Sequence, residues 1–319
     1  MKDNILKELP GVQKNILLKN YTNYKIGGFG KYFFVAKNKE SLVLALEFAK
    51  KNKLPVFIFG GGSNLLVSDK GFKGLVIKID ILGIEFCGKN VIVGAGVNLA
   101  QLANLLAEKG LSGLEWASGI PAATVGGAIF GHAQAFETKM SDSVKEVTVL
   151  DIKNLKIKKF TKKQCQFSLK NSIFKKTRKF VIISAVLEFS PKNTEEIKKL
   201  IEEFNNYRKN CHPLNFPSAG STFVNPTAKI KDKKLLIKFP ELNEYNRRGI
   251  IPAGFLIAKC GLSGKKIGGA QISEKHANFI LNLGGAKAKD ILALMNLAQK
   301  AVKKIFKINL QKEVQLVGF

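Results

Sequence analysis

Three consecutive glycines between two apolar segments constrain the fold of this chain more than any other feature. The stretch from Pro55 to Ile79 indicates a buried strand, then Gly60, Gly61 and Gly62, and then a second strand. A dinucleotide-binding Rossmann fold instead needs a glycine fingerprint that opens a helix. The glycines therefore predict a loop whose consecutive backbone amides can turn toward an anion. A plain tight hairpin is the alternative explanation.

A second glycine-rich stretch runs from Gly113 to Phe136. It contains the single tryptophan, Trp116, and very few charges. A loop of this length is normally either well solvated or functional. We expect its backbone to approach a flat ligand closely, and a helix and turn packed in the core is the alternative.

Hydrophobic periodicity predicts the remaining elements. Helices are expected over Lys39–Lys53, Asn98–Lys109, Asn193–Lys209 (opened by Thr194) and Lys289–Phe306, with a short helix and lead-in up to about Lys19. Strands are expected within Asn20–Ala36, over Val91–Gly96, in three antiparallel segments from Val144 onward, and at the edge segment LQKEVQLVGF. We expect a first domain over residues 1–192, with subdomains of about 20–85 and 86–192, and a second domain over residues 193–319.

The formal net charge of +28 would ordinarily suggest a nucleic-acid or anionic-membrane partner. However, 48 of the 52 positive residues are lysine, and they are spread over the whole chain. A protein that reads bases is expected to use arginine forks. A solvated, lysine-rich surface is therefore favoured. A basic nucleic-acid-binding module remains an alternative, which predicts salt-sensitive binding and no bound chromophore.

The four cysteines, Cys87, Cys165, Cys211 and Cys260, lie far apart without a CxxC pair. This spacing indicates neither a zinc site nor a disulfide scaffold, so no metal is expected. The N-terminal residues lack an apolar signal core, and no run approaches the roughly 20 apolar residues of a membrane span. We therefore expect a cytoplasmic protein with reduced thiols.

Two polar residues are candidates for chemistry. Ser221 lies in PSAGSTFVNP, behind a glycine, where a turn serine is the ordinary explanation and a proton donor the alternative. Glu313 lies in LQKEVQLV, where Leu310, Val314 and Leu316 are expected on the buried face and the glutamate on the other.

Five motifs, in this order, resemble the UDP-N-acetylenolpyruvoylglucosamine reductase family over nearly the whole chain. They are GGGSNLLVSDKGF, GLEWASGIP with TVGGAI, PSAGSTFVNP, AGFLI with GLSGKKIGGAQISEKHANFI, and LQKEVQLVG. The resemblance implies an α+β fold: an FAD-binding domain of the PCMH (vanillyl-alcohol-oxidase) type, then a C-terminal α+β substrate-binding domain. It implies bound FAD, NADPH as co-substrate, and reduction of UDP-N-acetylglucosamine enolpyruvate to UDP-N-acetylmuramate for peptidoglycan. We expect a monomer that neither binds nucleic acid nor inserts into a membrane.

This reaction needs particular side chains. Hydride arriving at the terminal carbon of an enol ether leaves negative charge beside the carboxylate, so the site needs a cation and a proton donor. The resemblance implies that Ser221 is the donor, that Glu313 assists the protonation, and that Lys170 stands where the family has its active-site arginine.

The resemblance also implies two binding sets. The residues matching the family's cofactor contacts are Lys25, Ile26, Gly60, Gly61, Gly62, Ser63, Asn64, Gly119, Ile120, Pro121, Thr124, Gly126 and Gly127. The residues matching its substrate contacts are Asn225, Lys209 and His276.

The sequence departs from the family pattern within these motifs. Lysine at position 170 keeps the charge of arginine but loses its bidentate fork. His132 and Gln134 stand where asparagine and glycine are usual, Val224 replaces a lysine, and GIPAATVGG is one residue longer and has alanine where glycine is common. We expect His132 to be a packed histidine rather than a flavin contact. The short spacing from Lys170 to Ser221 resembles the family's second type, and a divergent paralogue that binds FAD but reduces another substrate is an alternative.

Overall fold

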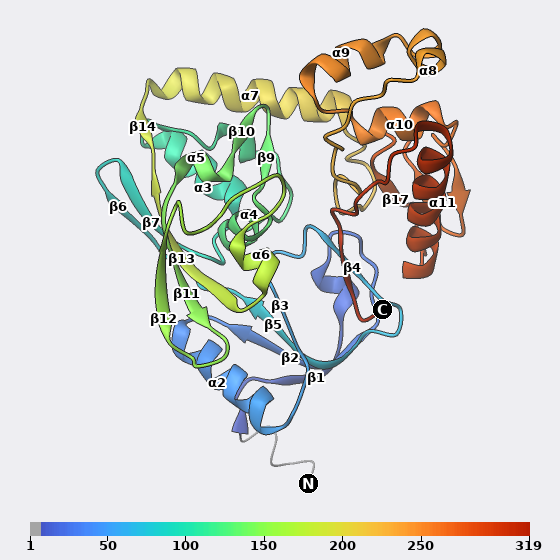
Figure 1. The fold of residues 1–319 in the computed structure, drawn as a ribbon. Coiled ribbons are helices and arrows are strands. Elements are labelled where there is room, and N and C mark those ends of the chain that lie inside the picture. The colour runs from blue at the N-terminus through green and yellow to red at the C-terminus, as the bar shows by residue number, and fades with distance from the viewer. Residues whose placement is uncertain (1–7) are drawn as a thin grey trace. The chain divides into compact units, whose positions relative to one another are not determined.

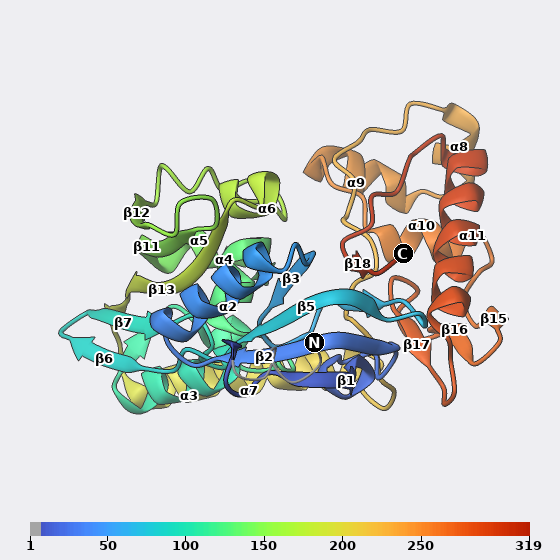
Figure 2. The same ribbon diagram turned by 90° about the horizontal axis from the view of Figure 1, so that it is seen from below.

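The computed structural model describes residues 8–319, which fall into two compact units. Unit 1 comprises the described residues up to Leu17 together with Phe29–Gly62 and Phe72–Arg208. Unit 2 comprises Leu18–Gly28, Ser63–Gly71 and Lys209–Phe319. Figure 1 and Figure 2 trace the described chain through both units, from blue at its first described residues to red at the C-terminus. The domain boundary expected at residue 193 stays a prediction.

The first sheet of unit 1 mixes parallel and antiparallel pairs. Its strands, in order, are β1 (Gln13–Leu17), β2 (Phe29–Ala36), β5 (Phe72–Ile79) and β3 (Val56–Phe59). β1 is antiparallel to β2, and both β2 and β3 are parallel to β5. The predicted helix α2 (Lys39–Lys51) is confirmed and begins at a capping box formed by Asn38 and Ser41.

The segment predicted as a short helix and lead-in up to about Lys19 contains a strand that was not predicted, although Glu8 is helical. Gln13–Leu17 forms strand β1 because it pairs with β2, and Leu18–Tyr21 follows as a 3-10 helix. Local periodicity could not identify that pairing. The portion of the prediction over residues 1–7 lies outside the described residues.

The predicted antiparallel sheet after Val144 is confirmed as part of a five-stranded sheet in unit 1. Its strands, in order, are β12 (Ile157–Thr161), β11 (Val144–Asp151), β13 (Phe180–Glu188), β7 (Asn90–Gly94) and β6 (Ile84–Cys87). All neighbouring pairs are antiparallel. The predicted helix α3 (Leu99–Glu108) is also confirmed, and the Asn98 side chain caps it by accepting from the Gln101 amide.

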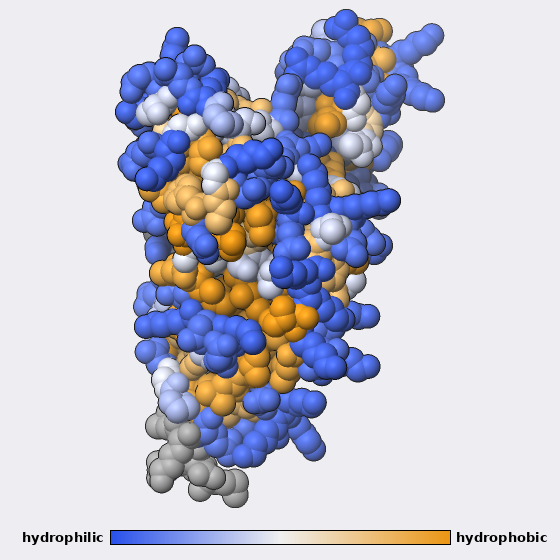
Figure 3. Space-filling model, turned by 90° about the vertical axis from the view of Figure 1, so that its left-hand side faces the viewer, coloured by the Kyte–Doolittle hydropathy of each residue, from blue (hydrophilic) through white to orange (hydrophobic). Residues whose placement is uncertain are grey.

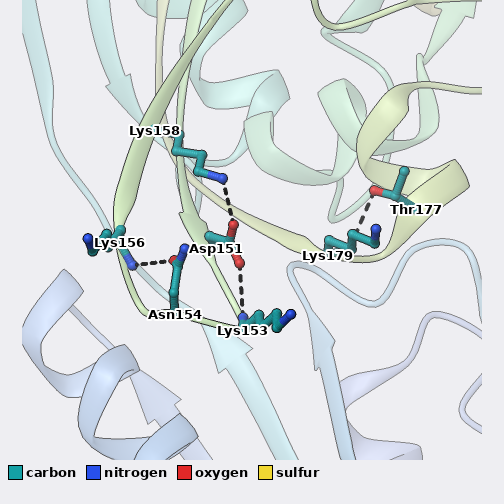
Figure 4. A network of polar contacts seen from close by, with 7 residues as sticks. All are labelled: Asp151, Lys153, Asn154, Lys156, Lys158, Thr177 and Lys179. Atoms are coloured by element: carbon teal, nitrogen blue, oxygen red, sulfur yellow. Dashed lines mark hydrogen bonds and ion pairs between the residues drawn. The ribbon is translucent and has the colours of Figure 1, made fainter.

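The turn between β11 and β12 is closed by side chains (Figure 4). The carboxylate of Asp151 accepts a hydrogen bond from the Lys153 amide at 2.9 Å and pairs with the Lys158 ammonium at 2.7 Å. Asn154 accepts from the Lys156 amide at 3.0 Å. The Lys158 hydrogen bond is the main reason why the pKa of Asp151 is lowered. These contacts fix the β11–β12 hairpin.

Short elements complete unit 1. They are β8 (Leu111–Ser112), a 3-10 helix (Glu115–Ala117), α4 (Val125–Gly131), β9 (Gln134–Ala135), β10 (Thr138–Lys139), α5 (Met140–Ser143), α6 (Ile173–Thr177), β14 (Ser190–Pro191) and α7 (Thr194–Cys211), whose last three residues belong to unit 2. The cap of α7 is Asn193, which accepts from the Glu195 amide at 2.8 Å, so Thr194 is the first helical residue. Trp116 and Phe174 are among the largest fully buried side chains of the unit 1 core.

Unit 2 contains two small sheets and four further helices. Strand β4 (Leu65–Val67) pairs in parallel with β18 (Gln315–Val317), and β15 (Lys266–Ile267), β16 (Ala270–Ile272) and β17 (Ile280–Asn282) form an antiparallel sheet. The helices are α8 (Lys233–Lys238), α9 (Glu241–Arg248), α10 (Ala253–Lys259) and α11 (Ala288–Phe306). The core of the unit includes Tyr24, Ile26 and Leu66, which lie far in sequence from the remaining members.

The C-terminal strand differs from its expected register. Leu316 is 38% exposed whereas Val317 is 3% exposed, so placing Leu316 on the buried face was wrong. The strand begins only at Gln315, so the expected alternation does not run through it from Leu310. Its partner is β4 in the glycine-loop segment, a pairing that local pattern does not reveal.

Hydrophilic side chains cover much of the face drawn in Figure 3, with hydrophobic residues exposed between them. Single exposed apolar residues are normal on protein surfaces. In the part of the chain that the structure describes, no helix is both long and apolar enough to cross a bilayer. The same residues contain no cluster of three or more side chains suited to holding a metal ion, and all four cysteines are free thiols.

Candidate functional site

The backbone around Ser221 is held by a buried asparagine. Asn278, which is 2% exposed, accepts from the Phe223 amide at 2.9 Å and donates to the Phe223 carbonyl at 2.8 Å. Its own carbonyl accepts from the Thr222 amide at 2.7 Å. Ser221 itself is half-buried and follows Gly220, whose φ of +72° favours glycine. Sequence reasoning missed Asn278, although it lies inside the matched HANF motif.

Glu313 lies on the segment next to Ser221. The Glu313 amide donates to the Thr222 carbonyl at 2.9 Å, and the Val224 amide donates to the Gln311 carbonyl at 2.9 Å. These bonds flank an antiparallel bridge between Phe223 and Lys312. The structure therefore brings the two predicted catalytic segments of unit 2 together, and Glu313 is half-buried rather than fully solvated.

Asn64, from the glycine-loop segment, also contacts the Glu313 segment within unit 2. Its side-chain amide donates to the Glu313 carbonyl at 3.1 Å, and its backbone carbonyl accepts from the Gln315 amide at 3.0 Å. Its Oδ1 atom is buried and has no hydrogen-bond partner among the residues described. A buried acceptor of this kind is costly unless a ligand or a water donates to it.

The two glycine-rich stretches of unit 1 touch each other. A Cβ on Gly60 would overlap the Thr124 hydroxyl, and a Cβ on Gly61 would overlap the Ala122 carbonyl oxygen. Over the described residues, the amides of Gly60, Gly61 and Gly62 donate no hydrogen bond within the protein. This loop therefore offers consecutive amide donors, which is a suitable arrangement for an anion.

Thr124 begins the helix that follows the second stretch. Its hydroxyl accepts from the Gly127 amide at 3.3 Å and caps α4. The alternative explanation, a helix and turn packed in the core, holds for α4, since Val125 and Ile129 are core residues. The segment before Thr124 lies against the glycine loop, and its close approach to a flat ligand stays a prediction. Ala122 has a φ of +51°, which costs roughly 1–2 kcal/mol for a residue with a Cβ.

Arg208 is a buried cation beside the same segment. It is 8% exposed, donates to the Trp116 carbonyl at 2.9 Å, and lies 5.2 Å from the centre of the Phe136 ring. A Cβ on Gly119 would come within 2.7 Å of its side chain, so a larger residue there would require that side chain to shift. Burial lowers the pKa of Arg208. Sequence reasoning did not single out this residue.

Lys170 lies on a tight turn in unit 1. Ser168 and Asn171 exchange backbone hydrogen bonds of 3.0 and 3.1 Å across the turn, and Lys170 adopts a φ of +53° between them. The Lys170 side chain is half-buried. The turn therefore presents a cation from a constrained backbone.

The predicted cofactor residues divide between the units. Lys25, Ile26, Ser63 and Asn64 belong to unit 2, and the other predicted contacts, from Gly60–Gly62 and Gly119–Gly127, belong to unit 1. Lys25 is exposed with a φ of +54°, whereas Ile26 is 2% exposed and packs in the unit 2 core. The Ile26 backbone carbonyl already accepts from the Thr22 hydroxyl at 3.1 Å.

The three predicted substrate residues lie in one region of unit 2. Asn225 accepts from the Ala253 amide at 2.9 Å at the start of α10. His276 lies against the next residue of that helix, since a Cβ on Gly254 would approach its ring to 3.1 Å. The Lys209 carbonyl accepts from the Lys275 ammonium at 2.7 Å, next to His276 in the chain.

Burial perturbs two histidines, one in each unit. Desolvation is the main cause that lowers the pKa of His132 and of His276 below the ordinary value of 6.5. The His276 ring accepts from the Asn278 amide at 3.3 Å through Nδ1, which is consistent with a neutral ring. His132 is 4% exposed, so the expectation of a packed histidine is confirmed.

We predict that the folded protein loses stability as the pH falls below 6.5. In that range the unfolded chain binds protons at both histidine positions, while the folded chain, with its lower pKa values, does not. The loss begins at 6.5 and ends below the folded pKa values. Urea unfolding at a series of pH values from neutral to about 5 tests this, within the range where histidine titrates. The variant His276→Asn should show a smaller loss, and a wild-type stability that is flat or rises across the range contradicts the prediction.

Comparison with known proteins identifies the family of this chain. A family model described as the C-terminal domain of UDP-N-acetylenolpyruvoylglucosamine reductase matches residues 212–317, and one described as an FAD binding domain matches residues 30–160. The reductase of Caldanaerobacter subterraneus subsp. tengcongensis is 38% identical over 302 residues, covering 94% of this chain and 92% of the relative. That of Bacillus subtilis is 36% identical over 314 residues, covering 98% and 96%.

A solved structure gives the same result. The crystal structure of the UDP-N-acetylenolpyruvylglucosamine reductase of Thermus caldophilus matches this chain with a TM-score of 0.76 and 30% identity, covering 96% of this chain and 98% of that one. The expected α+β fold, an FAD-binding domain followed by the family's C-terminal domain, is confirmed. This chain belongs to the UDP-N-acetylenolpyruvoylglucosamine reductase family.

Proposed function

We propose that this chain reduces UDP-N-acetylglucosamine enolpyruvate to UDP-N-acetylmuramate, using bound FAD and NADPH, in peptidoglycan synthesis. Family membership supports the reaction class. The observation that carries the proposal is the antiparallel pairing of the Thr222–Val224 backbone with the Gln311–Glu313 segment. This pairing places a serine hydroxyl and a carboxylate on adjoining, fixed segments.

The residues of unit 1 fit an FAD molecule. The amides of Gly60, Gly61 and Gly62 donate no bond to the described part of the protein, so they can bind the phosphate oxygens of a dinucleotide. Thr124 and Ala122 lie directly against that loop. FAD, when bound, supplies the hydride. The task left to the protein is orientation and charge.

Ser221 donates the proton in this proposal. Once hydride has been added, negative charge develops on the substrate carbon beside the carboxylate, and a positioned hydroxyl can protonate that carbon. A serine hydroxyl is a weak acid, so a neighbouring group has to assist the proton transfer. Glu313, on the paired segment, is the group proposed to assist it.

Lys170 holds the substrate carboxylate. Its ammonium is a compact charge with rotatable donors, so it can neutralise a carboxylate but cannot grip both oxygens in the planar geometry of arginine. We propose that the nucleotide sugar is bound by Asn225, Lys209 and His276. The Asn225 side chain accepts from Ala253 through Oδ1, which leaves its NH₂ group to donate.

We predict that Gly61→Ala removes most of the bound flavin. The added Cβ would overlap the Ala122 carbonyl, so the backbone of one loop must move. The flavin content of the purified protein, measured from its visible spectrum and by release on denaturation, gives the result. Gly131→Ala is the matched control, because nothing lies within 4 Å of a Cβ there. If Gly61→Ala retains the flavin content of the wild type, this loop does not bind the cofactor.

We predict that Ser221→Ala separates the two halves of the reaction. Reduction of the bound flavin by NADPH should be unchanged, while its reoxidation by the enolpyruvyl substrate should slow by roughly 100-fold or more, the scale of a general acid. Stopped-flow absorbance measures each half. Thr227→Ala, which removes an exposed hydroxyl just after the same stretch, is the control and should affect neither half. Equal slowing of both halves in Ser221→Ala would mean that Ser221 is structural.

A further inference from the structure

His132 makes hydrogen bonds through both ring nitrogens. It lies at the C-terminal end of α4 with a φ of +47° and is almost completely buried. Its Nδ1 lies 2.5 Å from the Ser168 carbonyl oxygen, and its Nε2 lies 3.0 Å from the Ser141 hydroxyl. The ring also stacks on Phe167, with 4.8 Å between ring centres. His132 therefore connects α4 directly to the segment that carries Lys170.

The partners determine the state of the ring. A carbonyl oxygen only accepts, so Nδ1 must carry a proton, and a neutral ring then accepts from Ser141 at Nε2. The charged groups facing the ring are Lys139 and Lys170, which lower its pKa, and Asp142, which raises it. Burial is the largest cause and lowers the pKa as well. One neutral tautomer therefore satisfies both nitrogens.

The turn that carries Lys170 depends on the Ser168 carbonyl. That oxygen accepts from the Asn171 amide, which closes the turn, and from His132, which ties the turn to α4. Two further bonds support the same segment. The Ser172 hydroxyl donates to the Phe130 carbonyl at 2.7 Å, and the Lys175 ammonium donates to the Lys170 carbonyl at 2.8 Å.

The other end of α4 lies at the glycine loop. Thr124 caps the helix and would be overlapped by a Cβ on Gly60. A single seven-residue helix therefore connects the amide cluster to the turn of Lys170. A polar bond at its C-terminal end can fix the backbone of Lys170 relative to the loop proposed to bind the cofactor.

We propose that His132 is a positioning residue for Lys170, and that its Nδ1–H bond to the Ser168 carbonyl fixes the turn that presents the Lys170 ammonium. The role of Lys170 rests on the proposed function. A lysine lacks the planar guanidinium of arginine, so how well it binds a carboxylate depends on how firmly its backbone is held in place. Two departures from the family pattern, His132 and Lys170, thus belong to one hydrogen-bonded unit.

Two substitutions separate the hydrogen bond from ring packing. His132→Phe keeps an aromatic ring on Phe167 and removes both polar contacts. His132→Asn removes the ring but can place an amide NH₂ where Nδ1–H lies. We expect His132→Phe to raise KM for the enolpyruvyl nucleotide sugar roughly tenfold, within the coupling measured between contacting residues. We expect His132→Asn to stay near the wild-type KM, and the reverse order would overturn the proposal.

A double-mutant cycle tests whether the effect passes through Lys170. In a Lys170→Ala background, His132→Phe should cause no further rise in KM. An undiminished rise would mean that His132 acts independently of Lys170 and would overturn the proposal. Ser141→Ala is the control, because it removes the Nε2 partner and leaves the bond to Ser168, so it should change KM by less than about twofold.

Amide hydrogen exchange gives a readout that does not need turnover. The Ser168 and Asn171 amides should exchange faster in His132→Phe than in the wild type and in His132→Asn, because the turn opens more often. Wild-type protein that fails to reduce the substrate would refute the proposed function but leave this comparison valid. Unchanged exchange in His132→Phe would overturn the positioning role itself.

Discussion

The amide of Asn278 imposes the constraint on which the proposed proton-delivery site depends. It pairs with both backbone groups of Phe223, as a neighbouring strand would, although no regular strand lies there. On the opposite side, the Thr222 carbonyl accepts from Glu313, so the short segment after Ser221 is bonded from two directions. A buried asparagine with all of these bonds made is rigid, and losing one would leave a polar group unsatisfied. The hydroxyl of Ser221 is thus presented from backbone that has little freedom to move.

In unit 1, unusual backbone conformations held by surrounding contacts constrain the functional loops. Three non-glycine residues that border its functional loops, Ala122, His132 and Lys170, have positive φ angles. Such conformations persist only where surrounding contacts over-determine them. Lys170 is held by the closed turn and by Lys175, and His132 by its two ring bonds. Ala122 lies against Gly61, where no side chain fits. These three are among ten described non-glycine residues of unit 1 with positive φ angles, and they lie beside the groups proposed to bind cofactor and substrate.

Sequence pattern predicted those parts of the fold that depend on local information. The helices α2 and α3 follow from apolar spacing with asparagine caps, and the absence of a helix after Gly62 excluded the Rossmann arrangement in the described structure. Elements set by distant partners were not predictable in this way. The strand Gln13–Leu17 forms because it pairs with β2. The exposed position of Leu316 follows from the pairing of β18 with β4, which lies near the other end of the chain. Asn64 and Glu313, which are hydrogen-bonded to each other, are likewise 249 positions apart in the sequence. The roles of Asn278 and His132 likewise depend on bonds to Phe223 and Ser168 that no sequence spacing reveals.

The central claim is that Ser221 faces the substrate carbon beside the carboxylate. The most direct measurement is a crystal structure of this chain with FAD and the enolpyruvyl nucleotide sugar bound. We predict that the Ser221 hydroxyl lies within about 3.5 Å of that carbon, the separation of a reactive complex, with the Glu313 side chain near the hydroxyl. A bound substrate whose corresponding carbon faces a different donor, with the Ser221 hydroxyl directed elsewhere, would contradict the account.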